Sequence, residues 1–184
     1  MNIASIDIGT NTILLLIVRI DLTTHKLQIL FEDQKIPRIG EGLKPGYPIS
    51  SAKEKLLLNI LDSYKKISND YKCEKILLSA TNAFRIASNS DYLTKKIKNS
   101  LDMTVTAISG EEEAKLTFMG CTWLKNSHNN YLVIDIGGGS TEIAYGKPGN
   151  LISFQSLPLG VVNLKERCFL RILQMRQKLA HVNP

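Results

Sequence analysis

The stretch Ile6-Asp7-Ile8-Gly9-Thr10-Asn11-Thr12 decides the fold, because a close relative of it recurs as Ile134-Asp135-Ile136-Gly137-Gly138-Gly139-Ser140-Thr141. Each copy follows a β-branched apolar run and precedes another, which predicts strand, glycine turn and strand. Glycine lets backbone N–H groups approach phosphate oxygens closely. An Asp beside a phosphate requires a cation, a positioned water or a backbone turn between the two charges. Two such turns facing each other predict a two-sided clamp on a phosphorylated ligand.

Ordinary hairpin turns also combine Asp and Gly, so a single copy would be typical of a purely structural turn. The repetition favours a functional role. In the second copy, three consecutive glycines precede Ser140-Thr141-Glu142. This run costs backbone entropy that a plain hairpin does not require. The phosphate clamp is therefore the preferred interpretation of the pair.

Size and composition are those of an ordinary globular chain. Its 184 residues suffice for one domain, or for one domain and part of another. Hydrophobic residues make up 43%, and residues 13–18 are too short an apolar run to span a bilayer. No targeting segment is evident, and we expect no membrane partner. Three scattered cysteines without CxxC spacing indicate neither a disulfide framework nor a zinc site, and predict a cytoplasmic location.

The net charge of +6 belongs mainly to the end of the chain. Residues 165–184 carry a net charge of +4, and the first 164 residues carry only +2. No stripe of basic residues alternates with aromatic residues that could stack on bases. We therefore expect no nucleic-acid partner.

The hydrophobic pattern predicts a mixed sheet with helices on its faces. Strands are expected near residues 2–8, 12–21, 26–34, 75–80, 103–108, 131–136, 142–146 and 151–157. Residues 36–47 are rich in Gly and Pro and are expected to form a loop. Helices are expected from a cap at Ser50 or Ser51, over 82–99 with a break near 89–90, over 109–124, and from about 160–162.

Three consecutive acidic residues, Glu111, Glu112 and Glu113, begin the helix expected over 109–124. Ser109 and Glu112 have the spacing of a capping box, and acidic residues suit a first helical turn in any case. Successive side chains on a helix point about 100° apart, so at most one or two of the three can cap. Another can face a cleft and orient a water as a general base.

Other candidates have both structural and chemical interpretations. Glu142 could be an exposed charge at a strand end, or a metal ligand alongside Asp135. Arg85 lies among small and apolar residues, which suits either a buried ion pair or a phosphate contact. GxSxG, GxxxxGK[ST] and GxGxxG motifs are all missing from the sequence. Metal-assisted attack by water is therefore the simplest chemistry for this set of residues.

Taken together, the motifs resemble the exopolyphosphatase and guanosine pentaphosphate phosphatase (Ppx/GppA) family. The matching segments are residues 7–12, 80–85, 108–114, 135–142 and 156–160, in family order over about the first 165 residues. The Ser-Gly-x-Glu-Glu-Ala segment at residues 109–114 is the most specific of them. The resemblance implies an α/β, ribonuclease H-like fold of the sugar kinase, Hsp70 and actin superfamily. It implies two lobes with the active site between them, here 1–124 and an incomplete 125–184.

The resemblance also implies an activity, Mg²⁺-dependent hydrolysis of terminal phosphoanhydride bonds in polyphosphate or guanosine pentaphosphate, and a possible homodimer in full-length members. Glu113 is implied as the base that activates water, and Arg85 as the arginine on the phosphate side. Asp135 and Glu142 are implied as catalytic and metal-associated residues, and Asp7 is a further metal-ligand candidate. The implied phosphate contacts are Gly9, Asn11, Gly137, Gly138, Gly139, Ser140 and Thr141.

Two departures from the family pattern qualify this expectation. Leu14 stands where many relatives carry Arg or His, so one substrate contact is missing. The match fades after about Leu170, and the basic tail from Arg171 is unlike the family. We therefore expect a truncated member, with much apolar surface left uncovered. A non-catalytic remnant with residual phosphate binding is the alternative, and an ATP-dependent kinase of the same superfamily is a weaker one.

Overall fold

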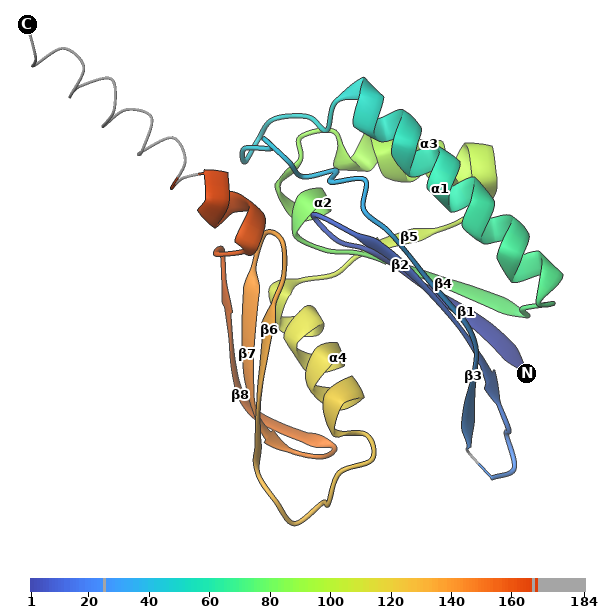
Figure 1. Cartoon of the computed structure of the whole chain (residues 1–184), viewed down its shortest axis with the longest axis vertical. Helices are drawn as coiled ribbons and strands as arrows, with labels where there is room; N and C mark the ends of the chain where they lie inside the picture. Colours follow the sequence, from blue (N-terminus) through green and yellow to red (C-terminus); the bar gives the residue numbers. More distant parts are fainter. Residues whose placement is uncertain (25, 167, 169–184) are drawn as a thin grey trace, which may run out of the picture.

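The chain folds around two separate β-sheets. The computed structural model describes residues 1–24, 26–166 and 168. Figure 1 shows the sheets as two lobes that approach each other at one end and diverge at the other. The basic tail predicted from Arg171 lies outside the described residues. None of the described helices is long and apolar enough to cross a membrane.

The first sheet has five strands in the order β3-β2-β1-β4-β5. Strands β1 (Asn2–Ile8), β2 (Ile13–Ile20) and β3 (Leu27–Lys35) are antiparallel neighbours. Strands β4 (Lys75–Ala80) and β5 (Val105–Ala107) pair in parallel beside β1. This is the mixed sheet that the sequence predicts. Because β1 is the central strand, the turn that follows Ile8 lies in the middle of the end of the sheet at which β1 terminates.

Two helices cover one face of this sheet, α1 (Ser51–Asp70) and α3 (Ser90–Leu101). Ser50 caps α1 by accepting a hydrogen bond from the Lys53 backbone N–H, as predicted. Buried side chains of α1 and α3 meet alternate residues of β1 and β2 in a single apolar core. The helical region expected over 82–99 is divided into a short α2 (Asn82–Ile86) and α3, with the interruption near the predicted place.

The second sheet is an antiparallel meander of β6 (Tyr131–Ile136), β7 (Thr141–Lys147) and β8 (Asn150–Leu157). Helix α4 (Gly110–Thr122) packs against all three strands. Its packing therefore groups α4 with the second sheet, whereas the sequence-based division at residue 124 assigns it to the first lobe. Residues 161–166 are helical, as expected.

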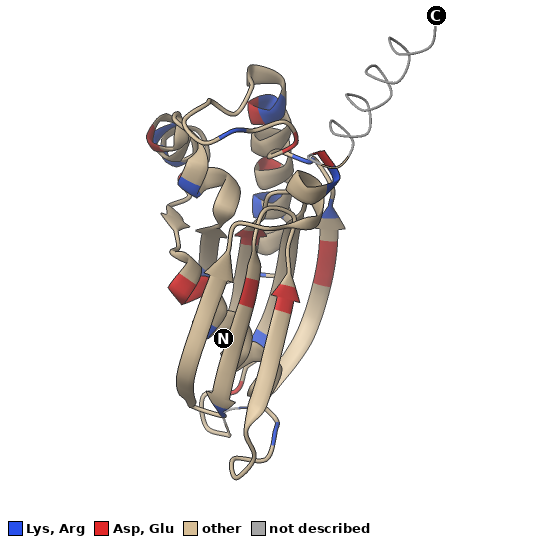
Figure 2. Cartoon of the chain, turned by 90° about the vertical axis from the view of Figure 1, so that its left-hand side faces the viewer, with Lys and Arg blue, Asp and Glu red and all other residues tan. Residues whose placement is uncertain are grey.

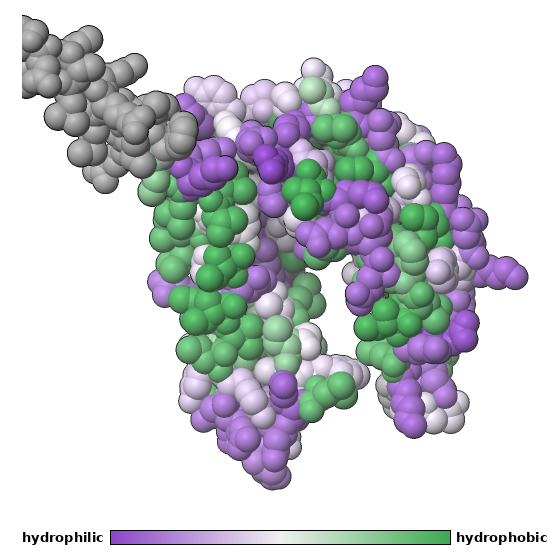
Figure 3. Space-filling view, viewed as in Figure 1, coloured by the Kyte–Doolittle hydropathy of each residue, from purple (hydrophilic) through white to green (hydrophobic). Residues whose placement is uncertain are grey.

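Large apolar side chains remain exposed on the second lobe. Leu132, Ile134 and Ile136 of β6 are each more than half exposed. Helix α4 likewise exposes Leu116, and Trp123 at its end is exposed as well. Figure 3 shows apolar surface on both lobes beside the opening between them.

The charged residues are distributed differently. Figure 2 shows basic and acidic residues interspersed on the side of the molecule that it presents.

Candidate active site

The two glycine-containing motifs form equivalent turns. In the first, the Gly9 N–H donates to the Thr12 carbonyl at 2.9 Å, and in the second the Gly137 N–H donates to the Ser140 carbonyl at 2.9 Å. Each turn joins two antiparallel strands, β1 to β2 and β6 to β7. Each also has an Asp two residues before its first glycine, at position 7 or 135. The repeat in the sequence is therefore a repeat in the structure.

The two turns touch, and the glycines of the second turn allow this contact. A Cβ on Gly138 would lie 3.0 Å from the Asn11 Cβ, and one on Gly139 would lie 2.6 Å from the Thr10 hydroxyl oxygen. Gly160 fits against the backbone of Gly138 in the same way. None of the three glycines of the second turn, Gly137, Gly138 and Gly139, has a positive φ. Close approach between the lobes is therefore the physical reason for Gly138 and Gly139, whereas a Cβ on Gly137 would meet only the Ser140 carbonyl oxygen of its own turn.

A cavity of about 300 Å³ lies between the turns. Most of the predicted site residues line it: Asp7, Gly9, Asn11, Glu113, Asp135, Gly137, Gly138, Gly139 and Ser140. It is also lined by residues that the sequence analysis did not select, among them Thr10, Thr12, Thr81 and Val161. Thr12 and Thr81 lie within the family motifs at residues 7–12 and 80–85, and their hydroxyl groups were the signal that could have identified them.

The three acidic residues at the start of α4 lie in different environments, and only Glu113 reaches the cavity. Glu112 forms the predicted capping box with Ser109, with its carboxylate accepting from the Ser109 N–H at 2.8 Å. Glu111 is exposed. Glu113, the next residue along, turns toward the cavity. Three successive carboxylates on one helical turn thus point in different directions, as the helix geometry requires.

Arg85 does not line the cavity but lies behind Glu113. Its guanidinium donates to the Glu113 carboxylate at 2.7 Å and to the Ile108 carbonyl at 3.0 Å. Burial raises the pKa of Glu113, and the bond from Arg85 opposes that rise only in part. The ion pair fixes the Glu113 side chain, while desolvation moves its pKa toward the range that suits a general base.

Two predicted residues lie beside the cavity without lining it. Glu142 is buried, and its carboxylate accepts a hydrogen bond from the Ser156 hydroxyl at 2.8 Å. Its charge adds to the rise in the pKa of Glu113. The Thr141 hydroxyl donates to the Leu159 carbonyl at 2.5 Å. Glu142 is thus neither the exposed strand-end charge nor a residue open to the cavity.

Asp7 is the titratable group of the site with the largest shift in pKa. Burial, followed by the charge of Asp135, raises the pKa of Asp7 to about 6. Its Oδ1 is buried without a hydrogen-bond partner in the described part of the chain. No lysine or arginine of the described residues lines the cavity. The cavity therefore concentrates negative charge, which a cation entering together with a phosphate would offset.

The residues present fit a divalent cation only in part. Among residues 1–24, 26–166 and 168, no three His, Cys, Asp or Glu side chains are grouped so that they could hold a metal ion. The predicted ligand set of Asp7, Asp135 and Glu142 is therefore not assembled as a complete site, since Glu142 is engaged by Ser156. Asp7 and Asp135 both line the cavity, and the Asp7 Oδ1, which has no hydrogen-bond partner among the described residues, is available to a metal ion. Two carboxylates with water and substrate phosphates are the usual environment of Mg²⁺.

Comparison with known proteins agrees with this architecture. The sequence profile of the Ppx/GppA phosphatase family matches residues 16–183. The chain is 34% identical over 166 residues to a guanosine-5'-triphosphate,3'-diphosphate pyrophosphatase of Pseudoalteromonas atlantica, and covers 33% of that protein and 90% of its own length. It is 33% identical over 174 residues to a bifunctional 3-dehydroquinate synthase/phosphatase of Fusobacterium nucleatum, of which it covers 26%, with 91% of its own length matched.

Solved structures show the same relationship. A Ppx/GppA family member from Aquifex aeolicus superposes with a TM-score of 0.79 at 32% identity, over 90% of this chain and 54% of that one. An exopolyphosphatase from Cytophaga hutchinsonii gives a TM-score of 0.84 at 29% identity, over 91% and 53%. The chain thus spans about half the length of these structures and a third or less of the curated relatives. It has the ribonuclease H-like, actin-like fold expected from the sequence, and it belongs to the Ppx/GppA phosphatase family.

Proposed function

We propose that the chain carries the phosphate-binding half of a Mg²⁺-dependent hydrolase that removes terminal phosphates from inorganic polyphosphate or guanosine pentaphosphate. One observation carries the proposal: both glycine turns and the Glu113 carboxylate line the same cavity. The Gly9 and Gly137 N–H groups are engaged within their own turns, so the other backbone N–H groups of the turns are the proposed donors to phosphate oxygens. The names of the relatives from Pseudoalteromonas atlantica and Cytophaga hutchinsonii agree with phosphoanhydride substrates.

Glu113 is proposed as the general base. It is largely buried, its pKa is raised, and Arg85 holds it in one orientation toward the cavity. In this role, its carboxylate accepts a proton from the attacking water while that water approaches the terminal phosphorus. Arg85 positions the base and does not itself contact the cavity. The restrained carboxylate lowers the entropic cost of orienting the water.

Asp7 and Asp135 are proposed to hold the metal ion. Mg²⁺ bound there would offset the charge of the transferring phosphoryl group and of the leaving phosphate. The negative cavity explains why such an ion is needed. Thr10, Thr12 and Ser140 line the same cavity, and their hydroxyl groups are candidates to bind phosphate oxygens.

The test compares two Glu→Gln substitutions two residues apart on α4. Phosphate release from long-chain polyphosphate and from guanosine pentaphosphate is measured with Mg²⁺ and with EDTA. Glu113→Gln is expected to slow release by roughly 10²–10⁴-fold, the usual contribution of a general base. Glu111→Gln, on the exposed side of the same helix, is expected to leave the rate unchanged. Equal rates for the two variants would remove Glu113 from the mechanism. A wild-type rate no higher than in buffer would favour a non-catalytic remnant.

A further inference from the structure

The three glycine carbonyl groups of the second turn are all hydrogen-bonded to residues 160–163, which we call the support segment. The bonds run from the Val161 N–H to the Gly137 carbonyl at 3.0 Å, from the Val162 N–H to the Gly138 carbonyl at 2.9 Å, and from the Asn163 side-chain amide to the Gly139 carbonyl at 2.9 Å. Three successive carbonyl oxygens are therefore held on one side of the turn.

This arrangement also fixes the direction of the backbone N–H groups of the turn. In a trans peptide group the C=O and the N–H point in opposite directions. The N–H groups of Gly138, Gly139 and Ser140 therefore point away from the support segment. None of them has a hydrogen-bond partner within the described part of the chain, and all three residues line the cavity between the turns. The support segment thus leaves three consecutive donors available to a phosphate.

The first glycine turn is held in the same way by the loop that follows β3. The Gly40 N–H donates to the Thr10 carbonyl at 2.9 Å, and the Arg38 N–H donates to the Asn11 carbonyl at 3.0 Å. Thr10 and Asn11 are the second and third residues of their turn, counted from its first glycine. The carbonyls of the second and third residues of the other turn are also held from outside. Two segments of unrelated sequence therefore hold equivalent peptide groups.

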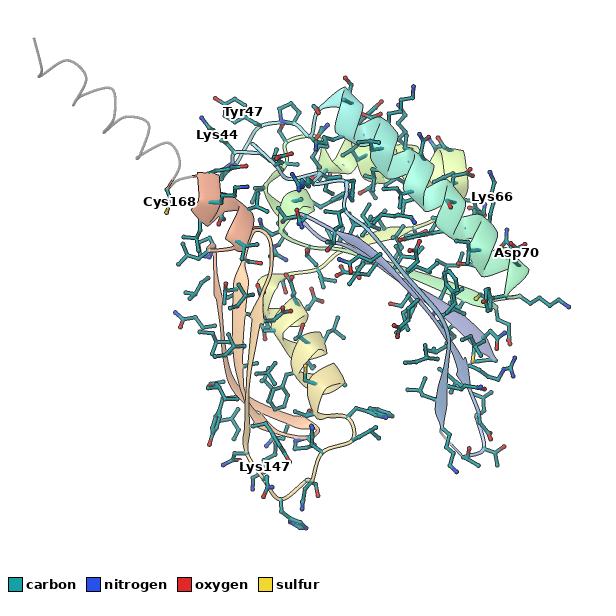
Figure 4. All side chains as sticks on the ribbon, in the orientation of Figure 1. Lys44, Tyr47, Lys66, Asp70, Lys147 and Cys168 are labelled. Atoms are coloured by element: carbon teal, nitrogen blue, oxygen red, sulfur yellow. The ribbon has the colours of Figure 1, made fainter. Side chains whose placement is uncertain are left out.

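A glycine brings each supporting segment into contact with its turn. A Cβ on Gly40 would overlap the Thr10 side chain, and a Cβ on Gly160 would overlap the backbone of the second turn. Figure 4 shows that the two supports are neighbours, since the loop that carries Lys44 lies beside the segment that leads to Cys168. The supports are therefore built into the same end of the molecule as the cavity.

Asn163 differs from the other supports because its donor is a side chain. Its Oδ1 accepts a hydrogen bond from the Gly160 N–H at 2.7 Å. Its Nδ2 donates to the Gly139 carbonyl, and also to the Pro158 carbonyl at 3.3 Å. The oxygen caps the helical segment 161–166 as the third residue of a capping box does, and the nitrogen holds the turn. The two tasks are separable, because each belongs to one atom of the amide.

We propose that Asn163 is a positioning residue for phosphate binding, whose side-chain amide holds the Gly139 carbonyl away from the cavity so that the Ser140 N–H faces the phosphate. The inference rests on the proposed function, and Asn163 itself does not line the cavity. Glycine restricts the rotation of its peptide groups very little. Without the amide donor, the peptide after Gly139 can turn its carbonyl oxygen toward the phosphate and repel it.

The experiment uses two substitutions that divide the Asn163 amide. Asn163→Asp keeps an oxygen acceptor for the Gly160 N–H and loses the donor to Gly139, whereas Asn163→Leu keeps a similar volume and loses both. Binding of inorganic tripolyphosphate to the full chain is measured by calorimetry with Mg²⁺, and stability is measured by urea unfolding. Asn129→Asp adds the same charge in the exposed loop before β6 and is the matched control.

Both Asn163 variants are expected to weaken tripolyphosphate binding by about tenfold, near the lower end of the effect of a hydrogen bond to a charged group. Only Asn163→Leu should lower the urea midpoint, because an acidic residue suits the first turn of a helix. Tripolyphosphate should shift the Ser140 amide resonance in ¹H–¹⁵N spectra of wild type, and much less in either variant. Asn129→Asp should match wild type in all three measurements.

Two patterns of weakening would identify a different role. Weaker binding in Asn163→Leu alone would show that the amide only caps the helical segment, and weaker binding in Asn163→Asp alone would show an effect of charge. Either pattern, or unchanged affinity in both variants, would overturn the inference and leave the phosphate site intact. A wild-type chain that does not bind tripolyphosphate would instead refute the proposed function, and the inference with it.

Discussion

Replacing Asp7 by Asn is expected to stabilise the metal-free chain at neutral pH, although Asp7 is proposed as a metal ligand. The pKa of Asp7 is about 6 in the folded chain against an ordinary value of 3.8. The folded chain therefore binds a proton more tightly than the unfolded chain does. Stability is highest below about pH 4, falls as the pH rises through this window, and carries the full penalty above about pH 7.

The magnitude follows from that difference in pKa. About two pKa units at 1.36 kcal/mol each correspond to roughly 3 kcal/mol. Because Asp7 retains some contact with solvent, we expect about 2 kcal/mol to be observed. Asn removes the charge and keeps the shape of the side chain. Asp7→Asn should therefore gain about 2 kcal/mol at pH 8 and almost nothing at pH 3.5.

The assay is urea unfolding in EDTA at the two pH values, followed by circular dichroism. Asp62→Asn serves as the control, because Asp62 is half-exposed and its only salt bridge among the described residues is to Lys66 on the surface of α1. Added Mg²⁺ should then stabilise wild type and not Asp7→Asn. A loss of stability at pH 8, or an equal gain at both pH values, would refute the account of Asp7 as a buried, uncompensated carboxylate.

Three further substitutions and one matched control test the scaffold of the site by urea unfolding. Arg85→Met leaves the Glu113 carboxylate buried without its partner and should cost about 3 kcal/mol, and the loss should shrink in the double variant with Glu113→Gln. Gly139→Ala drives a methyl group into the contact between the turns and should cost about 1–3 kcal/mol. Its control, Gly120→Ala, meets open space within α4 and should instead stabilise by up to about 1 kcal/mol. Ser109→Ala removes one half of the capping box and should cost about 1 kcal/mol. A stabilising Gly139→Ala would contradict the close contact of the turns.

The fold could be predicted closely because local patterns and the repeated motif agree. Alternation of apolar residues identifies β1 and β6, the serine caps identify the starts of α1 and α4, and the family motifs supply the topology. Element boundaries were predicted less closely. Strand β5 is only Val105–Ala107, because pairing with β4 ends there, whereas the apolar pattern extends over 103–108.

The sequence selected most of the residues that line the cavity, but it did not indicate all of their contacts. Spacing on a helix correctly indicated that Glu112 and Glu113 would diverge. It could not reveal that Arg85 pairs with Glu113, because 28 residues separate them in sequence and only the fold brings them together. The burial of Glu142 against Ser156 depends on the pairing of β7 with β8 and is likewise invisible in a single segment. The hydrogen bond from the Gly42 N–H to the Glu166 carboxylate joins residues 124 positions apart, so no local pattern could indicate it.

The central claim is that the two glycine turns hold one phosphate while Glu113 faces it. A crystal structure of the chain with Mg²⁺ and orthovanadate, a mimic of the transferring phosphoryl group, measures this most directly. The account predicts vanadate between Gly9 and Gly138, with the metal ion on Asp7 and Asp135 and a vanadate oxygen facing the Glu113 carboxylate. Vanadate bound elsewhere, with the cavity between the turns filled by water alone, would contradict it.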